Sequence, residues 1–116
     1  MRIILLVALL LSGCGNIPSF YDDNESLLAV NVRYEVSQLN CEKQIRIKKL
    51  KKSVDVLALY SESKGSQDVY KLVLLMKETS DGLYIREAPS VSYCNLKKKA
   101  LQKQSDDIAR AIMRRY

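Results

Sequence analysis

The sequence predicts a small all-α domain, a four-helix bundle in up-down-up-down order. Three stretches between residue 44 and the C-terminus repeat apolar residues at spacings of three and four, which is typical of amphipathic helices. Gly65 and Pro89 interrupt the chain between these stretches. Cys41 and Cys94 fall where an up-down order brings the end of the first helix and the start of the fourth together.

The first predicted element begins at the acidic cluster Asp22-Asp23-Asn24-Glu25, in which Asp22 and Glu25 have the spacing of a capping box. Apolar and polar residues then alternate over residues 28–36, which is also a strand pattern. An α+β domain with a strand at 28–36 is therefore the rival fold. A helix would place two groups on separate faces: Leu28, Val32, Val36 and Leu39, and Leu27, Val30 and Tyr34. We prefer the helix because it agrees with the positions of the cysteines.

The second element is the most regular one. Its apolar stripe consists of Ile47, Leu50, Val54 and Leu57, and Ser61 continues the same spacing. The helix should stop at Lys64-Gly65, because glycine readily takes the left-handed conformation that ends a helix.

The third element opens at Ser66, a favourable N-cap residue, and the fourth opens near Ser92. The core stripe predicted for the third helix is Val69, Leu72, Val73, Met76, Ser80 and Leu83. The stripe predicted for the fourth is Leu96, Ala100, Leu101, Ile108 and Ile112.

The N-terminus has the layout of a secretory signal peptide: Arg2, an apolar run over residues 3–11, and then small residues. The run is too short to cross a bilayer, which needs about 20 apolar residues. The run ends in Leu11-Ser12-Gly13-Cys14, which resembles the lipobox of bacterial lipoproteins.

The resemblance implies that the thiol of Cys14 is alkylated with diacylglycerol and that cleavage before Cys14 removes residues 1–13 as the signal peptide. It also implies acylation of the new amino group, typically with palmitate. Residues 14–21 would then form a lipidated tether, and residues 22–116 a single helical domain. In this family the residue after the cysteine directs sorting, and Gly15 favours the outer membrane of a Gram-negative host, with the domain in the periplasm.

Three cysteines are an odd number for a secreted chain. Lipidation of Cys14 leaves Cys41 and Cys94, which we expect to pair as a disulfide in an oxidising compartment. The alternatives, a reactive thiol or a metal site, lack support because the chain has no CxxC motif and no histidine.

The residue inventory offers little for catalysis. Without histidine there is no Ser-His-Asp triad and no imidazole metal site, and no glycine-rich phosphate-binding motif is present. The acidic pair Asp22-Asp23 is explained as a helix cap, and Asp106-Asp107 as solvated surface. We expect no enzyme activity, no metal, no cofactor other than the covalent lipid, and no small-molecule substrate.

Basic residues are the main surface feature of a chain whose formal net charge is +6. The candidates for contact with an anionic surface are Lys43, Arg46, Lys48, Lys49, Lys51, Lys52, Lys97, Lys98 and Lys99. A solvated helix exterior would carry the same charges. The functional interpretation is a surface for anionic headgroups, envelope polymers or an acidic protein. A nucleic-acid partner is not expected in this compartment.

The sequence therefore predicts a lipid-anchored envelope protein that acts by binding a protein or an anionic envelope component, in an accessory, assembly or phage or plasmid exclusion role. The alternative is a phage lysis factor similar to the outer-membrane subunit of a spanin pair. Those subunits are small lipoproteins but are often rich in proline, whereas this chain has two prolines.

Overall fold

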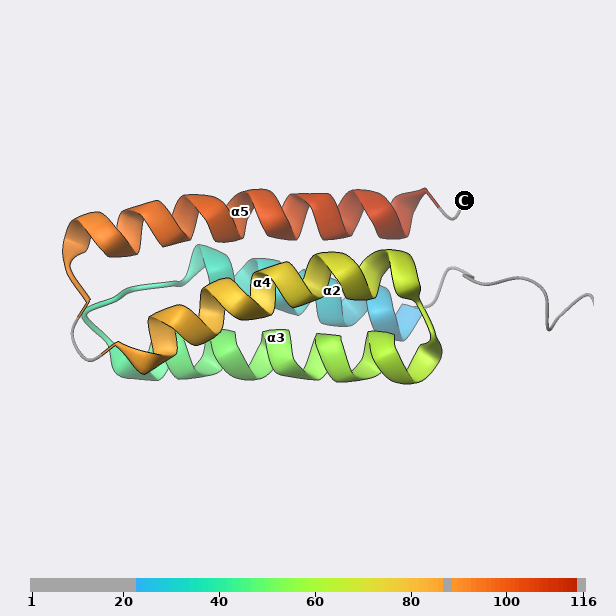
Figure 1. Cartoon of the computed structure of the whole chain (residues 1–116), viewed down its shortest axis with the longest axis horizontal. Coiled ribbons are helices and arrows are strands. Elements are labelled where there is room, and N and C mark those ends of the chain that lie inside the picture. Colours follow the sequence, from blue (N-terminus) through green and yellow to red (C-terminus); the bar gives the residue numbers. More distant parts are fainter. Residues whose placement is uncertain (1–22, 87–88, 115–116) are drawn as a thin grey trace, which may run out of the picture.

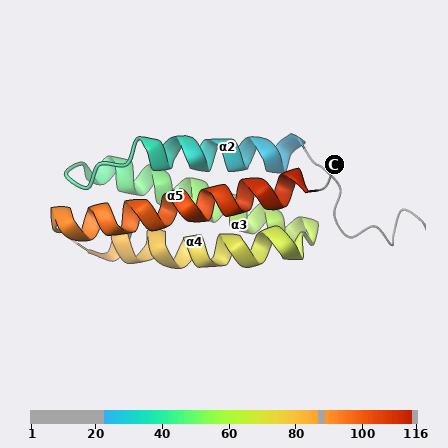
Figure 2. The same ribbon diagram turned by 90° about the horizontal axis from the view of Figure 1, so that it is seen from above.

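A computed structural model of the chain describes residues 23–86 and 89–114, which form four antiparallel helices and no strand. They are α2 (Asp23–Ser37), α3 (Gln44–Lys64), α4 (Gln67–Ile85) and α5 (Val91–Met113) (Figure 1). Each helix packs against the next, and α2 packs against α5, so the four close a ring. Figure 2 shows α2 and α4 on opposite sides of α5. The predicted all-α, up-down bundle is confirmed. The predicted signal peptide and tether lie outside the described residues.

The first element is a helix, and the rival strand at 28–36 is wrong. A strand would place Val30, Val32 and Tyr34 on one face, but Val32 is buried while Val30 and Tyr34 are exposed. The helical period explains this split, because Val32 falls beside Ala29 and Val36 on the core face. A strand and a helix would bury different residues of this segment, and the observed burial is that of a helix.

Glu25, predicted as part of a capping box, is fully buried against the last turns of α3. Its Oε2 accepts a hydrogen bond from the Ser61 hydroxyl at 3.5 Å, and its Oε1 lies 3.9 Å from the Lys64 ammonium. Asp22, the other half of the predicted box, lies outside the described residues. The contact with Ser61 marks the register between α2 and α3.

The turn between α3 and α4 follows the prediction at Gly65, whose φ of 79° is left-handed. The Gly65 amide donates to the Glu62 carbonyl and the Ser66 amide donates to the Ser61 carbonyl, as in a Schellman motif. Ser66 precedes α4 as expected, but its side chain makes no capping hydrogen bond there.

The last helix begins at Val91, one residue before the predicted start. Ser90 is its N-cap, and the Ser90 hydroxyl accepts a hydrogen bond from the Tyr93 amide at 3.2 Å. Leu96, predicted to be core, is 64% exposed. It stands on the outer side of α5, away from the stripe formed by Leu101 and Ile108.

The core runs the length of the bundle and draws on every helix. Its fully buried side chains include Leu50, Leu57, Met76, Leu83 and Leu101. A disulfide joins Cys41 and Cys94, whose Cα atoms are 6.0 Å apart, and so ties the loop after α2 to the first turn of α5. We call this the disulfide end. The opposite end holds the start of α2 and the end of α3.

Candidate binding surface

The outer side of α3 carries basic and apolar residues together. Its core stripe turns Leu50, Val54 and Leu57 inward, so the residues between them face solvent. The exposed set on that side is Ile45, Lys48, Lys49, Lys52, Val56 and Leu59. Leu59 is 67% exposed and Ile45 56%, values that the bundle's own packing does not require. The set contains no acidic residue.

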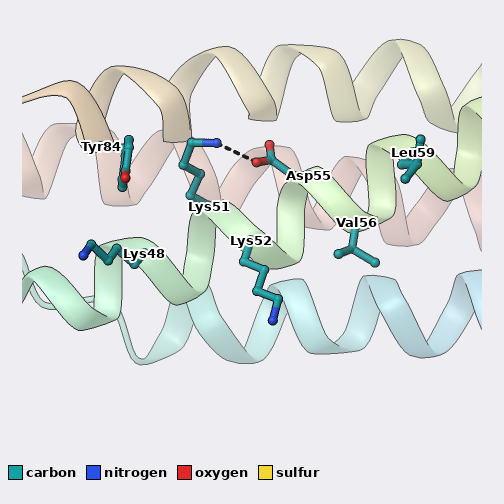
Figure 3. A pocket seen from close by; sticks show the side chains of 7 residues that line it. All are labelled: Lys48, Lys51, Lys52, Asp55, Val56, Leu59 and Tyr84. Carbon is teal, nitrogen blue, oxygen red and sulfur yellow. Dashed lines mark hydrogen bonds and ion pairs between the residues drawn. The ribbon is translucent and has the colours of Figure 1, made fainter.

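An open hollow of about 460 Å³ lies along the seam between α3 and α4 (Figure 3). Its lining consists of Lys48, Lys51, Lys52, Asp55, Val56, Leu59 and Tyr84. In Figure 3, Lys51 points toward Asp55, while Lys48 and Lys52 extend away from that carboxylate. The Lys51 ammonium also lies 5.3 Å from the centre of the Tyr84 ring.

A network of two lysines and two aspartates connects α3 and α4 beside this hollow. Its members are Lys51 and Asp55 on α3 and Lys77 and Asp81 on α4. Asp55 accepts hydrogen bonds from Lys51 at 2.6 Å and from Lys77 at 2.9 Å. Asp81 accepts one from Lys77 at 3.0 Å and lies 3.6 Å from the Lys51 ammonium. Because two positive and two negative charges compensate one another, this network contributes no net charge to the surface.

The network shifts the pKa of three of its members. Partial burial alone would raise the pKa of Asp55, but hydrogen bonds from Lys51 and Lys77 outweigh it, and the net pKa lies below its ordinary value. The hydrogen bond to Asp55 raises the pKa of Lys77, and Asp81 adds to the effect. The pKa of Lys51 is raised mainly by the same carboxylate. All three groups are therefore charged across the physiological range.

Lys48, Lys49 and Lys52 form no ion pair with any residue in the described part of the chain. They are exposed, and their charges are available to a partner. Lys51, predicted as part of the same surface, is instead held inside the network with Asp55. The sequence could not separate these four lysines because it does not show which of them faces α4.

The other predicted basic residues gather at the disulfide end. Lys43 precedes α3 and Arg46 lies in its first turn. In α5, the Lys97 ammonium lies 5.5 Å from the centre of the Tyr93 ring, and Lys98 donates to the Leu39 carbonyl at 3.5 Å. Lys99 is exposed. The whole predicted set thus occupies the half of the bundle farther from the start of α2.

Exposed apolar residues also occur on α2, and no binding role was predicted for them. Leu27 is 66% exposed, Val30 59% and Tyr34 55%, and all three stand opposite the core stripe of their helix. In the sequence they form a second apolar stripe, although a helix that packs against a core on one side requires only one.

Within residues 23–86 and 89–114, no helix is both long and apolar enough to cross a membrane. The same residues contain no cluster of three or more side chains suited to hold a metal ion. Comparison with known proteins found no family model, no curated protein and no solved structure that matches this chain.

Proposed function

We propose that this protein is held in the bacterial envelope by lipid on Cys14 and acts there by binding rather than by catalysis. Its partner is an anionic component of the envelope or a protein with an acidic surface. The observation that carries the anchor is Leu11-Ser12-Gly13-Cys14 at the end of a short apolar run. Two or more acyl chains hold a protein on a membrane stably, where a single chain does not.

The binding role is supported by the outer side of α3. Lys48, Lys49 and Lys52 have no intramolecular ion pair among the described residues, and Val56 and Leu59 are exposed beside them. Uncompensated cations next to exposed apolar side chains complement a partner that is both acidic and apolar. A solvated exterior would need the lysines but not Leu59.

Fractionation of cells tests the anchor. Wild-type protein should be found in the membrane fraction and extracted by detergent, whereas Cys14→Ser should remain an unprocessed precursor or appear in the soluble fraction. A Cys14→Ser protein that is processed and stays membrane-bound would contradict the anchor. An immunoblot that resolves precursor from mature protein distinguishes a Cys14→Ser protein that stays on the membrane as an unprocessed precursor from one that is processed and still membrane-bound.

A pulldown from detergent-solubilised envelopes tests the binding surface. The variant Lys48→Glu/Lys49→Glu/Lys52→Glu should fail to recover the envelope components that wild-type protein pulls down. Lys71→Glu on α4 is a suitable control, because Lys71 is also exposed and forms no ion pair with the described residues. Recovery of the same components by all three proteins would rule out the basic surface as the binding site.

A further inference from the structure

Two exposed stripes run side by side along the seam between α2 and α3. On α2 the stripe is Leu27, Asn31 and Tyr34, and on α3 it is Ile45, Lys49, Lys52 and Val56. The α2 residues are spaced by four and then three positions, and the α3 residues by four, three and four, which places each set on one face of its helix. We call these two stripes together the α2–α3 face.

The hydrogen bond between Glu25 and Ser61 shows how the stripes align. Because α2 and α3 are antiparallel, each step along α2 from Glu25 corresponds to a step back along α3 from Ser61. Asn31 is thus level with residue 55, and Tyr34 with Lys52. A shallow hollow of about 250 Å³ on the seam confirms this alignment, since Asn31, Lys49, Lys52 and Val56 all line it.

The face mixes apolar and cationic side chains. Leu27 is 66% exposed, Tyr34 55%, Ile45 56% and Val56 41%. Lys49 and Lys52 stand among them, with no ion pair to any described residue. Apolar side chains with interspersed lysines are the pattern of surfaces that lie in the headgroup layer of a membrane. A tyrosine suits the same layer, because its ring packs while its hydroxyl stays hydrated.

One carboxylate lies on the seam and needs an explanation. Glu35 lines the same hollow as Lys49 and Lys52, but it is half-buried and its Oε2 is shielded from solvent. Its side chain is therefore less exposed than those of Lys49 and Lys52. Two exposed lysines and one half-buried carboxylate leave the face with a net positive charge.

The short tether before α2 keeps this face within reach of the membrane that holds the lipid. Eight residues lie between Cys14 and Asp23, and the nine steps from one to the other reach about 30 Å in an extended chain. The stripe from Ile45 to Val56 is about 16 Å long at 1.5 Å per residue. A bundle tethered through α2 can therefore lie flat with this face on the membrane that holds its lipid.

We propose that the α2–α3 face rests on the anionic phospholipid surface of that membrane. This inference rests on the lipid anchor of the proposed function. The apolar side chains enter the headgroup layer, and Lys49 and Lys52 meet lipid phosphates. The bundle then lies along the bilayer, and α4, on the far side of the ring from α2, faces away from it.

Tryptophan fluorescence tests the orientation, because the chain contains no tryptophan of its own. The probe Tyr34→Trp lies on the face, and the control Leu75→Trp lies on α4 at the same 55% exposure. Lipidated mature protein is reconstituted into vesicles of phosphatidylglycerol and phosphatidylethanolamine, or of phosphatidylcholine alone. Brominated lipids then quench any tryptophan that reaches the headgroup layer.

We expect blue-shifted emission and strong quenching of Tyr34→Trp in the anionic vesicles, and neither for Leu75→Trp. In phosphatidylcholine, or with Lys49→Glu/Lys52→Glu added, the quenching of Tyr34→Trp should weaken severalfold. Equal quenching of the two probes would overturn the inference. So would a Tyr34→Trp signal that is exposed on pure lipid but shielded in native envelope vesicles, which would assign the face to a protein.

Co-flotation of the protein with the vesicles separates the two levels of the proposal. Protein that fails to float lacks the anchor, and the proposed function fails with it. If the protein floats but the tryptophan of Tyr34→Trp stays exposed to water, the anchor is supported and only the proposed orientation is wrong.

Discussion

The Lys77 ammonium on α4 donates a hydrogen bond of 2.9 Å to Oδ1 of Asp55 on α3. Lys51 donates to the other oxygen of the same carboxylate at 2.6 Å. Asp55 therefore links two helices at its two oxygens, on a part of the surface where side chains are about one-third exposed. Pairs this accessible contribute modestly to stability, but a shared carboxylate makes their loss measurable.

Replacing Asp55→Asn should lower the free energy of unfolding by about 1 kcal/mol at neutral pH. The pKa of Asp55 is depressed in the folded state, so its contribution is present at neutral pH and lost as pH falls below about 4. The pKa of Lys77 is raised, so its contribution disappears only in strongly alkaline solution. Urea unfolding at a series of pH values should show the difference from wild type shrinking toward pH 3.

The matched control for this prediction is Asp107→Asn. Asp107 pairs at 3.3 Å with Lys103, which is 81% exposed, and we expect a change of only a few tenths of a kcal/mol. A difference between Asp55→Asn and wild type that stays constant from pH 7 to pH 3 would refute the charge network.

Removing the disulfide with Cys41→Ser/Cys94→Ser should cost about 4 kcal/mol, the chain-entropy value for a loop closed over 53 residues. Chemical denaturation of the variant measures the loss. Wild type under reducing conditions should shift by a similar amount. Identical denaturation midpoints for oxidised and reduced wild type would show that the bond contributes nothing.

Two glycines should respond in opposite directions to alanine. Gly65→Ala should destabilise by about 1 kcal/mol, because φ is 79° and a Cβ disfavours that region. Gly82→Ala, inside α4, should stabilise by up to about 1 kcal/mol. Its new Cβ would meet the Tyr93 hydroxyl at 3.6 Å, an ordinary contact. Thermal unfolding of both variants tests the assignment, and a stabilised Gly65→Ala would contradict it.

Leu57 and Leu59 are two residues apart on α3 but should differ sharply. Leu57→Ala should cost about 2–5 kcal/mol because it opens a cavity in a fully buried site. Leu59→Ala should change stability by less than about 0.5 kcal/mol, since its side chain is 67% exposed. If Leu59→Ala proved equally damaging, Leu59 would be part of the core rather than of a binding surface.

The sequence predicted the helices well where periodicity was unambiguous. The stripe from Ile47 to Leu57 is the core of α3, and Gly65 ends that helix as predicted. Residues 28–36 were harder, because alternation and the helical period coincide over a short stretch. The arrangement of Cys41 and Cys94 resolved the choice correctly, since long-range geometry constrains topology in a way that local pattern does not.

The surface could be predicted only in part. Composition located the lysines, but whether one is free depends on the neighbouring helix: Lys51 meets Asp55 and Asp81, while Lys52, one residue on, meets neither. Leu96 was misplaced for a different reason: it precedes Leu101 by five residues, which is about 140° around the helix. The helical period continues the stripe of Leu101 and Ile108 to Cys94, which is buried, and leaves Leu96 outside it. Contacts between helices thus decide what the periodicity of each helix leaves open.

The intact mass of the mature protein extracted from membranes decides whether this bundle is carried by lipid on Cys14. We expect a chain that begins at Cys14, carries the added mass of diacylglycerol and an N-acyl chain, and lacks two protons because Cys41 and Cys94 are bonded. A chain that retains residues 1–13, or a mature chain with unmodified Cys14, would contradict it.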